Sequence, residues 1–139
     1  MKSSIDVRRV TTVTTGDFID VLRRSGLALR RPVADEKRIA TMLEKASLLV
    51  AAYDIEEGSK LVGIARSLTD FSYCCYLSDL AVDKAYQGRG IGKRLIEETR
   101  KAAGPQSMCL LLSAPAAMTY YEKIGMPKAE NAFIYEREF

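Results

Sequence analysis

The residues with the clearest capacity for chemistry lie between Gln87 and Lys93. Three glycines within five residues, Gly88, Gly90 and Gly92, follow a strand-like stretch and precede a helix-like one. Glycine has no Cβ and tolerates positive φ, so a ligand can approach its main chain closely. The first N–H groups of a helix have no partner within the helix, and the helix dipole adds partial positive charge there. This combination favours binding of a phosphate or another anion.

Two cations, Arg89 and Lys93, strengthen that interpretation over a glycine-rich turn without a ligand. Two nucleotide-binding motifs fit poorly. A dinucleotide-binding loop needs G-x-G-x-x-G and an acidic residue after the next strand. The next strand-like stretch, 108–113, ends without one. A Walker loop ends in Gly-Lys-Ser/Thr, whereas Arg94 follows Lys93 here. A nucleotide-dependent oxidoreductase is therefore the least favoured alternative.

The elements that must position this loop flank it directly. Residues 76–82 alternate as a strand that is apolar on both faces, which predicts a place inside a sheet. Alternation puts Tyr76, Ser78, Leu80 and Val82 on one face and Leu77, Asp79 and Ala81 on the other. Residues 91–103 repeat apolar side chains at helical spacing, and Gly104-Pro105 predicts the end of that helix.

Similar patterns place the other elements along the chain. Apolar alternation and turn residues predict strands at 5–13, 48–53, 61–68, 73–82, 108–112 and 133–139. Helical spacing and capping residues predict helices at 15–25, from Asp35 to 46, at 91–103 and at 115–124. The strands between 48 and 82 form an antiparallel meander, and the strand after the helix runs parallel to its predecessor through a right-handed crossover.

One segment of the sequence resembles a known family in three places. Gln87-x-x-Gly90-x-Gly92 resembles the Q-x-x-G-x-G signature of the GNAT superfamily of N-acetyltransferases. The preceding Asp79-Leu80-Ala81-Val82 resembles the strand that carries the acetyl group. Ala117-x-x-Tyr120-Tyr121-x-x-x-Gly125-Met126 resembles the A-x-x-F-Y-x-x-x-G-F segment. The matches cover roughly residues 76–126, and the N-terminal half matches only in its order of elements.

The resemblance implies a fold and a coenzyme. The expected fold is α/β (α+β) and GNAT-like, a central mixed, mostly antiparallel twisted sheet of six to seven strands with helices on both faces. Residues 1–139 are expected to form a single acetyltransferase domain. The implied cosubstrate is acetyl-CoA, with the pyrophosphate on the glycine loop and the pantetheine arm along the preceding strand. The residues assigned to it are Leu80, Ala81, Val82, Gln87, Gly88, Arg89, Gly90, Ile91, Gly92 and Lys93.

The resemblance also implies direct transfer of the acetyl group to an amine. Tyr121 aligns with the tyrosine that protonates the departing thiolate, and Tyr120 is expected in the core. The base is less clear, because alternation turns Asp79, the nearest carboxylate, away from the acetyl side. Asp79 is thus a candidate base beside a water route to solvent. Where the family often has Asn, this chain has Ala114, so Ser113 or main-chain groups are expected to contact the coenzyme arm.

Composition limits the classes of function. The chain has 139 residues, a formal net charge of +3, no histidine and three cysteines without metal-ligand spacing, which argues against a metal site. It lacks both an apolar run that could span a bilayer and a signal core, and its odd cysteine count suits a reducing compartment, so a cytoplasmic protein is expected. The charge suits an acidic small molecule without requiring nucleic acid. Homodimerisation is an open alternative.

The sequence leaves two questions about function open. The basic segment Arg23–Pro32 is either a solvated face or a rim that attracts an acidic coenzyme or substrate. The favoured function is acetyl-CoA-dependent N-acetyl transfer to a primary amine of a small molecule or a peptide. The alternative is a non-catalytic acyl-CoA-binding or regulatory module with the same fold, which the missing base carboxylate supports.

Overall fold

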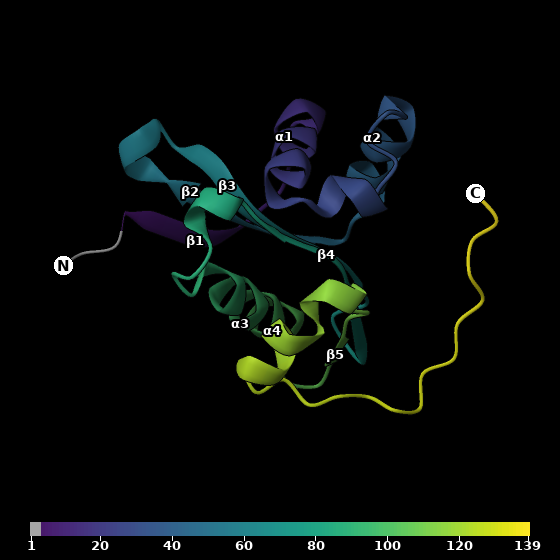
Figure 1. Ribbon diagram of the computed structural model, residues 1–139. Coiled ribbons are helices and arrows are strands. Elements are labelled where there is room, and N and C mark those ends of the chain that lie inside the picture. Colours follow the sequence, from purple (N-terminus) through teal and green to yellow (C-terminus); the bar gives the residue numbers. More distant parts are fainter. Residues whose placement is uncertain (1–3) are drawn as a thin grey trace.

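A five-stranded mixed sheet forms the centre of the molecule. The structure is a computed structural model that describes residues 4–139, so residues 1–3 of the expected domain lie outside the described part. Helices α1 and α2 cover one face and α3 and α4 the other (Figure 1). The strands are β1 (Ile5–Val10), β2 (Leu48–Asp54), β3 (Lys60–Thr69), β4 (Cys74–Val82) and β5 (Met108–Leu110). The helices are α1 (Thr15–Ser25), α2 (Glu36–Lys45), α3 (Ile91–Ala103) and α4 (Met118–Lys123).

Local sequence explains where the helices begin and end. The Thr14 side chain accepts a hydrogen bond from the Asp17 N–H and caps α1, and that of Asp35 accepts one from the Arg38 N–H and caps α2. Gly26 follows α1 with φ +88°, in the left-handed region that favours glycine. The sequence offers either Thr14 or Thr15 as the first cap, and Thr14 forms it; the expected cap Asp35 and the expected bounds of the helix at 91–103 are confirmed. The expected helix at 115–124 divides into a 3₁₀ turn and α4.

The order of the strands confirms the mixed topology. Strands β1 to β4 pair antiparallel with their sequence neighbours, and β5 pairs parallel with β4 after the crossover through α3. The expected count of six to seven strands is wrong for residues 4–139, because the sheet has five. The predicted strand at 133–139 does not form, and Phe133 and Tyr135 are fully exposed. A β5 of only three residues offers few main-chain groups at the sheet edge for another strand.

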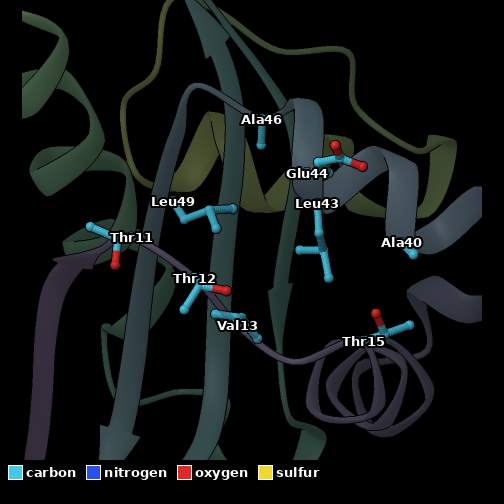
Figure 2. Close-up of a pocket in the computed structure, with 9 residues that line it drawn as sticks. All are labelled: Thr11, Thr12, Val13, Thr15, Ala40, Leu43, Glu44, Ala46 and Leu49. Atoms are coloured by element: carbon cyan, nitrogen blue, oxygen red, sulfur yellow. The ribbon is translucent and has the colours of Figure 1, made fainter.

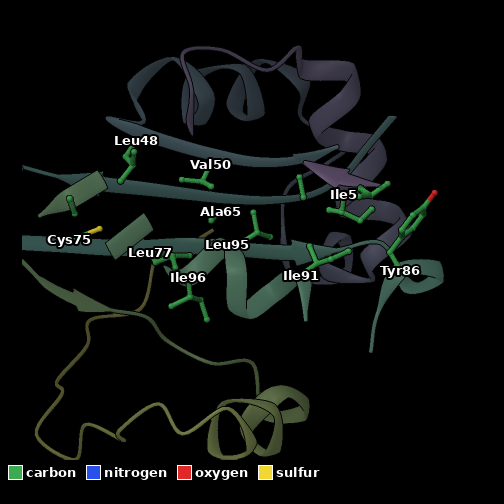
Figure 3. Packing of buried hydrophobic residues seen from close by; sticks show 13 residues of the cluster. Ile5, Leu48, Val50, Ala65, Cys75, Leu77, Tyr86, Ile91, Leu95 and Ile96 are labelled. Carbon is green, nitrogen blue, oxygen red and sulfur yellow. The ribbon is translucent and has the colours of Figure 1, made fainter. Parts of the chain in front are cut away.

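Two apolar clusters hold the helices onto the sheet. The cluster beneath α3 contains Ile91, Leu95 and Ile96 of that helix, packed on side chains of the strands (Figure 3). The other cluster packs Phe18, Leu22 and Ile39 of α1 and α2 against the opposite face. Each helix thus buries one stripe of its surface, which is the main source of the stabilising free energy.

A β-bulge in β4 changes which side chains share a face. Arg66 pairs with Asp79 but the next residue, Ser67, pairs with Leu77, so Ser78 is the extra residue. The prediction that Leu77 shares a face with Asp79 and Ala81 is therefore wrong. Leu77 lies in the cluster under α3, Ala81 lies in the cluster under α1 and α2, and Leu80 packs against the α3 side.

Candidate active site

The loop between β4 and α3 leaves main-chain groups open to a ligand. Gly88 and Gly90 have φ of +81° and +77°, and a Cβ at either position would meet no other atom within 4 Å. No side chain caps α3, whose N-cap residue is Gly90. The helix therefore presents its first N–H groups and the positive end of its dipole to the surface beside these glycines. A phosphate fits such a cradle without displacing any side chain.

Side chains around the loop hold it in place and add charge. The Gln87 amide donates to the Val82 carbonyl oxygen at 3.1 Å, which ties the loop back to β4. The Arg89 guanidinium lies over the Tyr86 ring, 4.9 Å from its centroid. Tyr86 in turn donates its hydroxyl hydrogen to buried Asp54 at 2.6 Å. Hydrogen bonding to Asp54, followed by burial, raises the pKa of Tyr86 to about 12, so this anchor stays protonated.

The third glycine serves packing instead of ligand access. A Cβ on Gly92 would lie 2.2 Å from the Tyr120 hydroxyl oxygen. Tyr120 therefore packs on the first turn of α3. Its side chain is partly exposed, so the prediction that Tyr120 lies in the core is wrong. Gly92 lets α4 approach α3 closely at this point.

Strands β4 and β5 separate six residues before the end of β4, the strand that leads into this loop. Their pairing ends at Tyr76 and Leu110, whereas β4 continues to Val82. The β5-facing edge of β4 after Tyr76 thus has no strand partner, and its main-chain groups are available to an extended ligand. Three residues assigned to the coenzyme, Leu80, Ala81 and Val82, lie on this part of the strand.

A cavity of about 880 Å³ opens beside the separated strands. It is lined on one side by Ser78 and Leu80 of β4 and on the other by Ser113 and Tyr121. The structure thus brings Tyr121 and Ser113 to the strand that the sequence assigned to the acetyl group. Residues 87–93 do not line the cavity and form a separate part of the site at the start of α3.

Tyr121 brings a protonated hydroxyl group to the wall of the cavity. Its side chain is half-buried, and no described residue hydrogen-bonds to its hydroxyl group. Burial, followed by the neighbouring Tyr120, raises the pKa of Tyr121 to about 12, so the hydroxyl keeps its proton at neutral pH. The two rings pack edge to face with centroids 5.2 Å apart. The Ser113 hydroxyl donates to the Ala114 carbonyl oxygen at 2.8 Å.

Asp79 lies on the other side of β4, in a buried cluster with two arginines. One carboxylate oxygen accepts from the Arg31 Nε at 2.5 Å and the other from the Arg66 Nε. Arg66 also donates to the Ser78 hydroxyl and the Met42 carbonyl oxygen, and Arg31 to the Ser78 carbonyl oxygen. The Asp79 carboxylate is fully buried, and both oxygens are engaged with guanidinium groups. This geometry favours a role in holding the arginines over a role in abstracting a proton.

Sequence reasoning did not single out Arg66 or Arg38, which also line the cavity. Arg66 interrupts the otherwise apolar stretch 61–68, and a charged residue within a buried strand requires a partner. The sequence alone could therefore have indicated that Arg66 has a buried anionic partner. Arg38 gives no comparable signal, because it is one of several polar residues on α2.

A second, smaller cavity of about 310 Å³ lies between α2 and the segment that joins β1 to α1 (Figure 2). Among the described residues its lining consists of threonine, alanine, valine and leucine side chains, with Glu44 as the one charged residue. Among residues 4–139 no helix is long and apolar enough to cross a membrane. Within the same range, no group of three or more His, Cys, Asp or Glu side chains is placed to hold a metal ion.

Comparisons with known proteins agree with this arrangement. The profile of the acetyltransferase (GNAT) domain family matches residues 44–125. The chain is 29% identical over 105 residues to the uncharacterized N-acetyltransferase ycf52 of Pyropia yezoensis, covering 72% of this chain and 58% of that one. It spans just over half the length of this relative and of the chloroplastic GCN5-related N-acetyltransferase 2 of Arabidopsis thaliana.

Solved structures show the same fold at low sequence identity. A probable acetyltransferase of meticillin-resistant Staphylococcus aureus superposes with a TM-score of 0.75 at 22% identity, covering 96% of this chain and 98% of the other. The aminoglycoside N-acetyltransferase AAC(6')-Iy, solved in complex with CoA, gives a TM-score of 0.71 at 15% identity, covering 100% and 98%. The family match spans more than half of the chain, and the chain therefore belongs to the GNAT family of acetyltransferases.

Proposed function

We propose that the protein transfers an acetyl group from acetyl-CoA to a primary amine by direct attack within a ternary complex. The observation that carries this proposal is the adjacency of two open main-chain surfaces. The uncapped start of α3 with Gly88 and Gly90 suits a pyrophosphate, and the unpaired edge of β4 suits an extended pantetheine arm. Few other ligands join a diphosphate to an extended, amide-containing arm.

The chain's own residues have distinct roles in this proposal. Main-chain groups of residues 87–93 hold the phosphates, with Arg89 and Lys93 adding charge, and β4 from Leu80 to Val82 orients the arm. Acetyl-CoA supplies an activated thioester, so positioning of the amine accounts for most of the catalysis. The Tyr121 hydroxyl donates a proton to the leaving sulfur. Burial raises its pKa to about 12, so the hydroxyl is protonated at neutral pH as an ordinary tyrosine is, and this shift by itself makes it a weaker acid.

The proton of the incoming amine follows water to solvent in this proposal. Asp79 lies on the acetyl strand itself, but its two oxygens accept hydrogen bonds from Arg31 and Arg66. Its proposed role is to position those guanidinium groups. Ser113, which lines the same cavity, is proposed to contact the coenzyme arm in place of the Asn that the family often has at the position of Ala114.

The test measures coenzyme binding and turnover separately. Calorimetric titration with CoA tests the phosphate and arm surfaces, and release of free thiol from acetyl-CoA is followed across a broad panel of amines. Both binding and amine-dependent thiol release are expected. Binding without thiol release for any amine would instead support the non-catalytic acyl-CoA-binding module.

A further inference from the structure

The floor of the large cavity carries more positive than negative charge. Arg31 and Arg66 share the single carboxylate of Asp79, and their side chains are 21% and 7% exposed. Two guanidinium groups and one carboxylate leave one buried positive charge without a counter-charge inside this cluster. A charge removed from water is costly unless an opposite charge accompanies it, so the cluster is electrostatically suited to receive an anion.

The walls of the cavity add further cations. Five arginines and one glutamate line it in the described part of the chain. Arg30, next to Arg31, is exposed and forms no ion pair with any described residue. Arg38 of α2 donates to a carboxyl oxygen of Phe139, the last residue of the sequence, at 3.0 Å and pairs with no acidic side chain of residues 4–139. The basic segment 23–32 is thus divided, with Arg24 paired to Asp83 and Arg30 and Arg31 directed to the cavity.

The coenzyme does not account for these arginines. Its phosphates are placed by the proposed function at residues 87–93, none of which lines the cavity. The part of the cavity beyond Ser78 therefore belongs to the acceptor. Along β4, Ser78, whose carbonyl oxygen accepts from Arg31, is two residues from Leu80, which corresponds to ~7 Å of strand.

We propose that the acceptor is a small amine that also carries an anionic group, a carboxylate or a phosphate, within a few bonds of the reacting nitrogen. This inference rests on the proposed function and names the substrate class of the same site. The amine lies at the open edge of β4 near Leu80, and the anion lies against the arginine cluster, where bidentate guanidinium contacts are available. Polycationic acceptors such as polyamines and aminoglycosides are disfavoured by like charge.

The experiment compares acceptors that differ only in the anion. β-Alanine is paired with β-alaninamide, α-amino acids with their carboxamides, and O-phosphoethanolamine with ethanolamine, and spermidine serves as the polycation. Thiol release gives kcat/KM for each acceptor at low and high salt. We expect at least one anionic acceptor to exceed its neutral partner by about 10-fold or more at low salt, with the difference falling as salt rises. The carboxylate and phosphate pairs show which anion the site prefers.

Variants then assign the preference to the cavity. Arg30→Ala and Arg38→Ala are each expected to reduce the anionic-to-neutral ratio about 3- to 10-fold, and Arg30→Lys to retain most of it. The affinity for CoA stays unchanged in all three. Arg23→Ala is the matched control, because Arg23 is exposed on α1 and does not line the cavity.

A second measurement separates failure of this inference from failure of the proposed function. In the presence of CoA, calorimetric titration compares N-acetyl-β-alanine with N-acetyl-β-alaninamide. Tighter binding of the acid without any turnover would overturn catalysis but retain the anion site. Turnover with equal use of acids and amides, or a preference for spermidine, would overturn the anion site and retain catalysis. Absence of both turnover and acid binding would overturn both.

Discussion

The proposed coenzyme side and the proposed acceptor side of this protein differ in the groups that they offer to a ligand. The coenzyme side, at the start of α3 and the free edge of β4, offers mainly main-chain groups exposed by glycines. The acceptor side is built from side chains of η1 (Leu27–Arg30), α2, β3 and β4, held by ion pairs between residues far apart in the sequence. Main-chain recognition leaves a local pattern in the sequence, whereas side-chain recognition assembled in three dimensions does not.

Blocking the main-chain groups of the glycine loop is expected to have the largest effect on the coenzyme side. Gly90→Asp places a side chain and a negative charge where nothing lies within 4 Å of a Cβ. Repulsion of the pyrophosphate and the added bulk are expected to lower the affinity for CoA by ~10³-fold or more, measured by calorimetric titration. Gly58→Asp is the matched control, since Gly58 also has positive φ, +66°, and open space but lies in the β2–β3 connection. Near-normal affinity in Gly90→Asp would remove the phosphates from this loop.

On the acceptor side, removal of the shared carboxylate is expected to lower the stability of the folded protein. Asp79→Asn leaves two mostly buried guanidinium groups without a carboxylate, which should reduce the free energy of unfolding by about 3–5 kcal/mol. Urea denaturation measures the change, and exposed Asp20→Asn should differ from the parent by less than about 0.5 kcal/mol. An Asp79→Asn variant with unchanged stability but ~100-fold slower turnover would make Asp79 the base after all.

Tyr121 connects the two sides, and its effect should appear in turnover. Tyr121→Phe removes the proposed proton donor while keeping the ring, so kcat is expected to fall about 10- to 100-fold with little change in the affinity for CoA. Steady-state kinetics with acetyl-CoA and the best acceptor measure both quantities. Tyr120→Phe is the control, because its hydroxyl lies against Gly92. An unchanged kcat in Tyr121→Phe would exclude it from the mechanism.

The smallest expected effect concerns the turn that leads into β4. Asp70 accepts hydrogen bonds from the N–H groups of Tyr73, Ser72 and Cys74, which lower its pKa from 3.8 to about 2. A pKa depressed in the folded state stabilises the protein above the unfolded value and loses that contribution as pH falls through the folded value. Asp70→Asn is therefore expected to be less stable than the parent at pH 6, with the gap narrowing between pH 4 and pH 2. Urea midpoints across that range give the measurement, and a gap that widens on acidification would contradict it.

The parts of the fold that follow local rules could be predicted from the sequence. Capping by Thr14 and Asp35, the glycine loop and the parallel crossover all depend on residues close together in the chain. Two features could not be predicted. The bulge at Ser78 depends on pairing with Arg66, and alternation alone placed Leu77 on the wrong face. The strand at 133–139 had the right alternation but no partner, because β5 ends after three residues.

The candidate site follows the same division. The assignment of residues 80–82 and 87–93 to the coenzyme could be made from the sequence because glycine spacing and strand pattern are local, and it stays a prediction. The pairing of Asp79 with two arginines was not, since Arg31 and Arg66 are 48 and 13 residues away from it. Asp79 lies on the strand assigned to the acetyl group, and the sequence alone makes it a candidate base because it does not show the two arginine partners.

The contact between Gly92 and Tyr120 has a consequence for how mutations in the glycine motif should be interpreted. The sequence motif does not distinguish the roles of its three glycines. Of the three, only Gly88 and Gly90 leave room for a ligand, whereas Gly92 accommodates the Tyr120 side chain of a neighbouring helix. A methyl group added at Gly92 would force the Tyr120 side chain to shift, and the ring of Tyr121, the proposed proton donor, packs against that side chain. Loss of activity in such a variant would report a misaligned donor, and coenzyme affinity would have to be measured separately before any phosphate contact was inferred from it.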